Sequence, residues 1–167
     1  MDKLEKAARR TRFERAKLYT LELLKQKVDA TLLESYTAAL IKMITKLQHN
    51  SVAYYEGMGY GNDHPTNLGV TFGEKWDKVW RLNHNDEKAS VLCFIDADTG
   101  LIYKPAGTSQ PYPKPRADMY DEDTFENTDP HGGWLYNNYD ENKPRNRYAG
   151  GRSTKQVIAE GNAKIKQ

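Results

Sequence analysis

Cysteine is almost absent from this chain of 167 residues, and Cys93 is the single example. No disulfide can form within the chain, and no cysteine zinc cluster can be built. Long hydrophobic runs are also missing, because no stretch approaches the roughly 20 apolar residues that a membrane span needs. The first fifteen residues are charged throughout and lack the apolar segment of a secretory signal. These absences favour a protein that is made and used in a reducing cytoplasm, without a membrane partner.

Neither sign of charge dominates. The 25 Lys and Arg residues nearly balance the 23 Asp and Glu residues, which leaves a net charge of +2. A protein dedicated to coating DNA would be far more basic. Basic residues nevertheless gather near both ends of the chain, where they could contact phosphates. The candidates are Arg10, Arg12, Arg145 and Arg147.

The chain is polar, with a mean hydropathy of −0.87, but its 11% of aromatic residues is enough for a folded core. We expect one α+β domain in which an N-terminal helical pair packs on a small antiparallel β-meander. The helices occupy residues 1–50 and the meander residues 51–136. Residues 137–167 form an extended polar C-terminal arm, in which Ser153 and Gln156 have the capping-box spacing that predicts a short helix.

The predicted helices rest on composition and periodicity. Residues 2–27 contain no Gly or Pro and are rich in good helix formers, so we expect one helix there. A second begins near Asp29 and carries an apolar stripe that ends at residues 49–50. Residues 51–72 contain three closely spaced glycines and predict an irregular strand followed by a loop.

The predicted strands follow in quick succession. Residues 76–82 alternate between apolar and polar, as in a half-buried strand, and residues 91–95 form the continuous apolar run of a central strand. Residues 96–100 predict a tight turn and residues 101–104 a third strand, which Pro105 ends. The proline-rich stretch after it is expected to be extended, and residues 132–136 suggest a short docking strand.

The most distinctive motif runs from the central strand into the proline-rich stretch. It reads Cys-Phe-Ile-Asp-Ala-Asp-Thr-Gly-Leu-Ile-Tyr-Lys-Pro-Ala from Cys93, and continues with Pro111, Lys114 and Arg116. It resembles a family of small, uncharacterised proteins of tailed bacteriophages, whose members carry a Phe-Val-Asp-x-x-Thr-Gly-x-x-Tyr-Lys-Pro-Ala hairpin and then a Trp-Lys-Ala-Pro segment. Thr108 stands where that family has Trp. The resemblance covers residues 76–136 and implies a phage origin, without implying an activity.

Aromatic residues supply one set of candidate binding residues. Tyr54 and Tyr55 could stack on bases or on a protein partner, or they could pack in the core. Trp76 and Trp80 lie on one face of their predicted strand with Lys78 between them. They either pack under helices or form an aromatic surface suited to single-stranded nucleic acid.

Basic residues around the prolines supply a second set. Lys104, Lys114 and Arg116, next to Tyr103, could bind a phosphate or a carboxylate. Alternatively, Arg116 pairs with a local acid such as Asp118 or Asp121.

Motifs for chemistry are weak. Asp96, Asp98 and Gly100 begin like a calcium loop but lack its later ligands, so a β-turn is the better interpretation. The four histidines form no metal-binding pair, and Cys93 lies in an apolar strand where a thiol is inert. We therefore expect no cofactor, no metal and no enzymatic activity.

The functional hypothesis is a non-enzymatic accessory protein of a tailed bacteriophage that binds nucleic acid or a host nucleoprotein in the host cytoplasm. The alternative is a virion structural protein, in which polar arms become ordered against other copies or other virion subunits.

Overall fold

The computed structural model describes residues 13–27, 35–143 and 149–166. Within these ranges, six antiparallel strands form one sheet in which the spatial order equals the sequence order. The strands are β1 (Leu18–Thr20), β2 (Leu68–Thr71), β3 (Trp76–Leu82), β4 (Lys88–Asp96), β5 (Leu101–Pro105) and β6 (Pro111–Asp118). The helices are α2 (Leu21–Lys27), α3 (Ser35–Gly57) and α4 (Thr154–Ile165), with 3₁₀ turns η1 (Glu122–Phe125) and η2 (Gly133–Leu135). The predicted α+β fold, with N-terminal helices on a β-meander, is confirmed.

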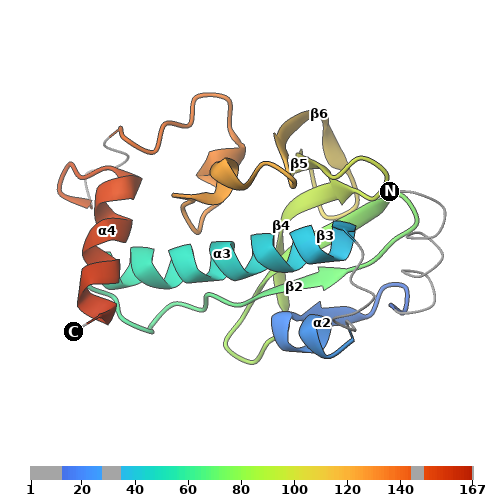
Figure 1. Ribbon diagram of the computed structural model, residues 1–167, viewed down its shortest axis with the longest axis horizontal. Helices are drawn as coiled ribbons and strands as arrows, with labels where there is room; N and C mark the ends of the chain where they lie inside the picture. Colours follow the sequence, from blue (N-terminus) through green and yellow to red (C-terminus); the bar gives the residue numbers. More distant parts are fainter. Residues whose placement is uncertain (1–12, 28–34, 144–148, 167) are drawn as a thin grey trace.

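Helix α3 lies along one face of the sheet, and α4 crosses its C-terminal end (Figure 1). The core fills the space between α3 and the sheet, because apolar positions recur along α3 at helical spacing. Tyr36, Leu40, Met43, Ile44 and Leu47 from the helix join Val70, Val79, Cys93, Ile95 and Ile102 from the strands. Burial of this many large side chains is the main stabilising contribution to the domain.

The β4–β5 hairpin agrees with its prediction. Val91 to Ile95 are all buried, as expected of a central strand covered on both faces. The Asp96 carboxylate accepts the backbone N–H groups of Asp98 and Thr99, and Gly100 has a φ of +76°. The Asp and Gly residues therefore shape a turn, which supports the β-turn interpretation over the calcium loop.

Two helix predictions were wrong at their ends. Residues 13–20 are not helical: Ala16 has a φ of +65°, and Leu18–Thr20 pair with β2. Phe13, Tyr19 and Phe72 form a buried aromatic cluster with ring centroids 4.2–5.7 Å apart. This tertiary packing overrides the helix propensity of the segment. Residues 2–12 lie outside the described part of the chain.

At the other end, residues 51–57 continue α3 and do not form a strand. The Asn50 side chain donates to the carbonyl of Phe125 and to the Thr128 hydroxyl, which links the helix to η1 and to the segment that follows it. The glycines that suggested an irregular backbone have two other roles. Gly57 allows α4 to approach α3 closely, and Gly59, with a φ of +84°, lies just after the end of α3.

The proline-rich stretch is an edge strand. β6 pairs with β5, with Pro111 opposite Pro105 and Pro115 opposite Tyr103. Prolines cannot donate to a ladder and are tolerated at an edge. Residues 132–136, predicted as a docking strand, instead contain the 3₁₀ turn η2, because the Asp129 carboxylate accepts from the N–H groups of Gly133 and Trp134.

The C-terminal helix begins at its predicted cap. Ser153 and Gln156 exchange side-chain and backbone hydrogen bonds in a capping box. Val157 and Ile158 are buried against Ala53, Tyr54 and Tyr55 of α3. The described residues from 149 onward therefore pack on the body, and the prediction of an extended arm was wrong for α4. None of the helices in the described ranges has the length and apolarity to cross a bilayer.

The α3–α4 contact is close enough to forbid a methyl group. A Cβ on Gly161 would lie 1.7 Å from the carbonyl oxygen of Ala53. Helix propensity alone predicts that Gly161→Ala stabilises by about 1 kcal/mol. We expect the opposite sign, because overpacking costs about 1–3 kcal/mol and the obstructing atom belongs to the backbone. Thermal unfolding followed by circular dichroism measures the change.

Gly107→Ala is the matched control, since a Cβ added there would have no atom within 4 Å and the φ of Gly107 is not positive. It should leave the melting temperature almost unchanged. A Gly161→Ala variant that melts at or above the wild-type temperature would contradict the described helix contact.

Candidate functional site

Two cations and two exposed tyrosines meet at the β6 edge of the sheet. The Lys104 ammonium lies over the ring of Tyr112 at 4.7 Å and over the ring of Tyr136 at 4.5 Å. The Arg116 guanidinium lies over Tyr112 at 5.2 Å and donates to the side-chain oxygen of Asn137. These five residues, from β5, β6 and the segment after η2, are called the edge cluster.

The backbone on both sides of Tyr112 is restricted by sequence. Pro111 and Pro113 flank it, and a residue that precedes proline is confined to extended conformations. Tyr112 is 39% exposed. Its ring is therefore presented to solvent from a strand that has little conformational freedom to lose on binding.

Tyr136 is held from the other side by buried neighbours. Trp134 and Leu135 are buried, and the Trp134 ring packs edge-on against Phe125 at 5.7 Å. The Tyr136 N–H donates to the carbonyl of Gly133, while its side chain is 52% exposed. The exposed ring thus follows directly after two anchors.

Arg81 secures the turn that carries these anchors. Its guanidinium donates to the carbonyls of Pro130 and His131, at 3.3 and 2.8 Å, and to Ser90 in β4. Burial lowers the pKa of Arg81 from its ordinary value. The side chain is a structural cation that ties residues 130–131 to β3 and β4.

Of the two interpretations of Arg116, the pairing with a local acid is not the contact that the structure shows: Arg116 donates to Asn137. Asp118 accepts from the N–H of Tyr120, and Asp121 caps η1. The Arg116 Nε atom is buried and has no hydrogen-bond partner within the described ranges. A buried guanidinium nitrogen in this state has unused capacity to donate.

Sequence reasoning identified Lys104 and Arg116 but missed the aromatic half of the edge cluster. Tyr112, Tyr136 and Asn137 were not among the candidates. A tyrosine between two prolines was the available signal for Tyr112. Nothing in the sequence placed Tyr136 next to Lys104, because that contact joins segments more than thirty positions apart. Lys114 is exposed on β6.

The two candidate tryptophans lie on the sheet face opposite α3. Trp80, Leu82, Val91 and Phe94 form a second, smaller cluster, against which Trp76 and Tyr103 pack. Lys88 and Lys78 lie over the Trp80 ring at 4.9 and 5.9 Å. Trp80 is only 9% exposed and Trp76 is half-buried. These rings therefore neither pack under α3 nor form an open stacking platform.

Tyr54 and Tyr55 pack in the core, which was one of the two interpretations of these residues. Both are buried between α3 and α4. Burial, with a smaller contribution from Tyr54, raises the pKa of Tyr55. His64 stacks on the Tyr55 ring at 4.5 Å. Since these rings are already packed, they offer no face for a base. Arg10, Arg12, Arg145 and Arg147 lie outside the described residues.

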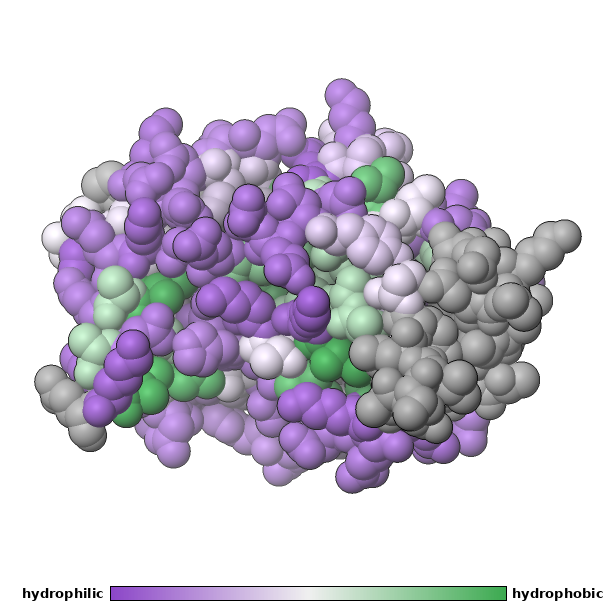
Figure 2. Space-filling model, in the orientation of Figure 1, coloured by the Kyte–Doolittle hydropathy of each residue, from purple (hydrophilic) through white to green (hydrophobic). Residues whose placement is uncertain are grey.

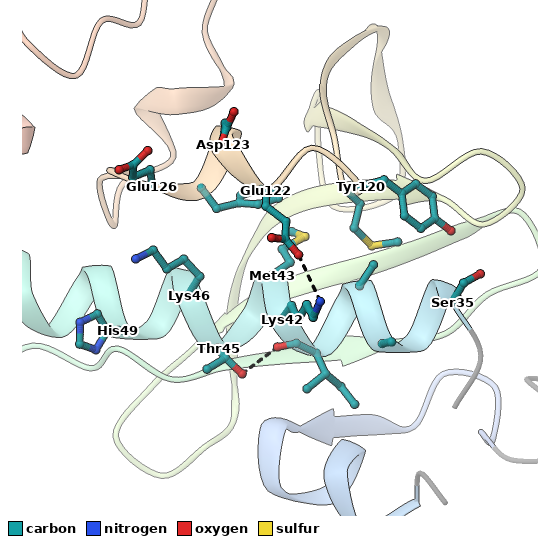
Figure 3. A pocket seen from close by; sticks show the side chains of 15 residues that line it. Ser35, Lys42, Met43, Thr45, Lys46, His49, Tyr120, Glu122, Asp123 and Glu126 are labelled. Carbon is teal, nitrogen blue, oxygen red and sulfur yellow. Dashed lines mark hydrogen bonds and ion pairs between the residues drawn. The ribbon is translucent and has the colours of Figure 1, made fainter. Parts of the chain in front are cut away.

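A groove of about 930 Å³ runs between α3 and the segment around η1 (Figure 3). Lys42 and Lys46 on α3 line it together with Glu122, Asp123 and Glu126, and Lys42 points toward Glu122. The Lys42–Glu122 ion pair, at 3.2 Å, spans the groove with both side chains more than 70% exposed. Such a pair contributes at most about 1 kcal/mol.

The surface around this groove is mostly hydrophilic, with hydrophobic residues in separate patches (Figure 2). Among the described residues, no three His, Cys, Asp or Glu side chains are grouped so as to hold a metal ion. The chemistry that the described surface offers most clearly is therefore that of the edge cluster, which combines positive charge with exposed aromatic rings.

The fold and the edge cluster define an α+β protein with a basic, aromatic rim on its last strand. The chain matches a family of unknown function, DUF7717, over residues 15–137, and it belongs to that family. The matched range includes all five residues of the edge cluster and ends at Asn137, before α4. No curated protein and no solved structure matches the chain.

Cys93 provides a test of the core. Burial raises the pKa of its thiol from 9.0 to about 12. The folded protein therefore keeps the proton at pH values where the unfolded chain loses it. This contribution to stability is fully present below about pH 9 and is lost as the pH rises toward 12, by about 1.4 kcal/mol per pH unit.

The free energy of unfolding should fall more steeply above pH 9 in the wild type than in Cys93→Ala, whose cavity adds only a constant offset. Denaturant unfolding at several pH values measures both slopes. Equal slopes would show that the thiol is not buried, as would rapid labelling by a thiol reagent near neutral pH.

Proposed function

We propose that this protein is a non-enzymatic binding protein that contacts single-stranded nucleic acid through the edge cluster. The observation that carries the proposal is that Lys104 lies over two exposed tyrosine rings and Arg116 lies over one of them, the ring of Tyr112. Aromatic rings stack on bases of any sequence, and nearby cations neutralise the phosphates between those bases. The proposal therefore predicts binding with little sequence preference.

Single strands are favoured over duplexes by the composition of the cluster. In a duplex the base faces are hidden in the stack, so exposed tyrosine rings would gain nothing from it. Within the described ranges, no helix protrudes from the β6 edge that could enter a major groove (Figure 1). The small net charge of +2 also argues against coating a long duplex.

A further part of the proposal is that the protein is an accessory protein of a tailed bacteriophage acting in the host cytoplasm; the motif around the β4–β5 hairpin supports the phage origin alone. The virion alternative depended partly on a free C-terminal arm. Because α4 packs on α3, residues 154–165 are not part of a free arm. We therefore prefer the accessory role over the role of a virion structural protein.

The presence of the protein in virus particles separates these alternatives. We expect mass spectrometry to find it in infected cells and not in purified particles. A stoichiometric amount in particles would overturn the accessory role in favour of the virion protein.

Binding can be measured by fluorescence anisotropy with a labelled short oligo(dT). Each neutralised phosphate contributes about −0.7 to the slope of log K against log salt for a single strand. Contacts from Lys104, Lys114 and Arg116 predict a slope of about −2. The Lys104→Ala/Arg116→Ala variant should bind more weakly and lower the magnitude of the slope by about 1.4.

Lys42→Ala is the matched control, because it removes an exposed cation in the groove and outside the edge cluster. Its affinity and slope should stay close to those of the wild type. Equal losses in both variants would indicate a nonspecific charge effect, and the absence of oligo(dT) binding by the wild type would overturn the proposal.

A further inference from the structure

The two tyrosines of the edge cluster present their faces to one point. The Lys104 nitrogen lies over both rings, at 4.7 and 4.5 Å from their centroids, so at most roughly 9 Å separates the two centroids. A planar group inserted between two rings needs two layers of contact, each about 3.5 Å deep. Two such layers add up to about 7 Å, which lies within this upper limit on the separation of the two rings.

We propose that Tyr112 and Tyr136 form a clamp for a single nucleobase, and that Lys104 leaves the clamp to bind the phosphate of the same nucleotide. This inference rests on the proposed function and names the unit that is recognised. The ligand class is a base that is both unstacked and attached to a phosphate. The clamp reads the face of the base and ignores its hydrogen-bonding edge.

The energies favour this exchange. An exposed cation–π contact is weaker than the stacking of a base on an aromatic ring. Moving the ammonium away from the two rings therefore costs less than stacking a base on both of them returns. The displaced ammonium also gains a charge-assisted hydrogen bond to phosphate. Lys104 acts as a placeholder that keeps the rings apart in the free protein.

Arg116 adds to the phosphate side of the site. Its guanidinium is held by Asn137 and by the Tyr112 ring. A guanidinium held in place loses little entropy when it donates to an anion. The clamp therefore has one mobile cation, Lys104, and one fixed cation, Arg116.

Both rings are held by structure that does not depend on the ligand. Tyr112 lies between prolines in β6, and Tyr136 follows the buried pair Trp134 and Leu135. Neither tyrosine belongs to a buried hydrophobic cluster, so replacing them leaves the core intact. Variants at these positions should fold, which melting temperatures equal to that of the wild type would verify.

The experiment compares three probes of equal length: oligo(dT), the same oligomer with one 2-aminopurine, and an abasic sugar–phosphate oligomer. Tyr112→Ala and Tyr136→Ala should each weaken oligo(dT) binding by roughly 5- to 150-fold, which corresponds to about 1–3 kcal/mol of stacking per base. Tyr112→Phe keeps the ring and should bind nearly as well as the wild type. Stacking should quench the 2-aminopurine fluorescence, and the abasic oligomer should bind the wild type about as weakly as oligo(dT) binds the Tyr→Ala variants.

Tyr60→Ala is the matched control, since Tyr60 is an exposed tyrosine on another part of the surface, next to Tyr55 and His64. It should leave affinity and quenching unchanged. If oligo(dT) binds but the abasic oligomer binds equally well, or the Tyr112 and Tyr136 variants match Tyr60→Ala, the clamp is overturned and the proposed function stands. If the wild type binds none of the probes, both proposals fall.

Discussion

Packing of α3 along the sheet is the constraint on which the rest of the structure depends. Its first half supplies one side of the core, and its buried Tyr36 hydroxyl donates to the buried Asp77 carboxylate of β3 at 2.6 Å. Its second half packs against α4 at Gly57. Near the middle of the helix, the Asn50 side chain donates to the carbonyl of Phe125. A buried carboxylate is stable only when hydrogen-bonded, so this contact sets the position of the helix as well as its burial. The segment that carries Tyr136 is thereby anchored to the same helix as the sheet.

The parts of the fold that could be predicted are those that local chemistry specifies. Alternation identified β3, the apolar run identified β4, and Asp96 with Gly100 identified the turn into β5. The capping box at Ser153 located the start of α4. In each case a short local pattern specifies the conformation, and no contact with a distant part of the chain is required.

The errors occur where distant contacts decide. Leu18–Thr20 have a helix-compatible composition, but Tyr19 is buried against Phe72 and the backbone pairs with β2. Residues 51–57 contain glycine because α4 approaches closely there, which no local pattern reveals. The same limit applies to the candidate site. The cations Lys104 and Arg116 stand in a motif that the sequence shows. Tyr136 was missed because only the path of the chain after η2 brings it to them.

The prolines of β6 connect the fold to the site. Pro111, Pro113 and Pro115 occupy alternate positions of this edge strand, and none of them has a backbone N–H to donate. Proline in an edge strand is one of the features that oppose pairing with other chains. The side chains between the prolines are Tyr112 and Lys114, and both are exposed.

On the proposed function, this arrangement also explains how a nearly neutral protein could bind a polyanion. A protein that relies on charge alone needs many cations, since each phosphate contact adds little at physiological salt. Rigid tyrosines add stacking that salt does not screen, and the prolines reduce the entropy lost when a ligand orders them. The edge cluster thus concentrates two kinds of interaction in five residues, so a small net charge is compatible with binding at this edge.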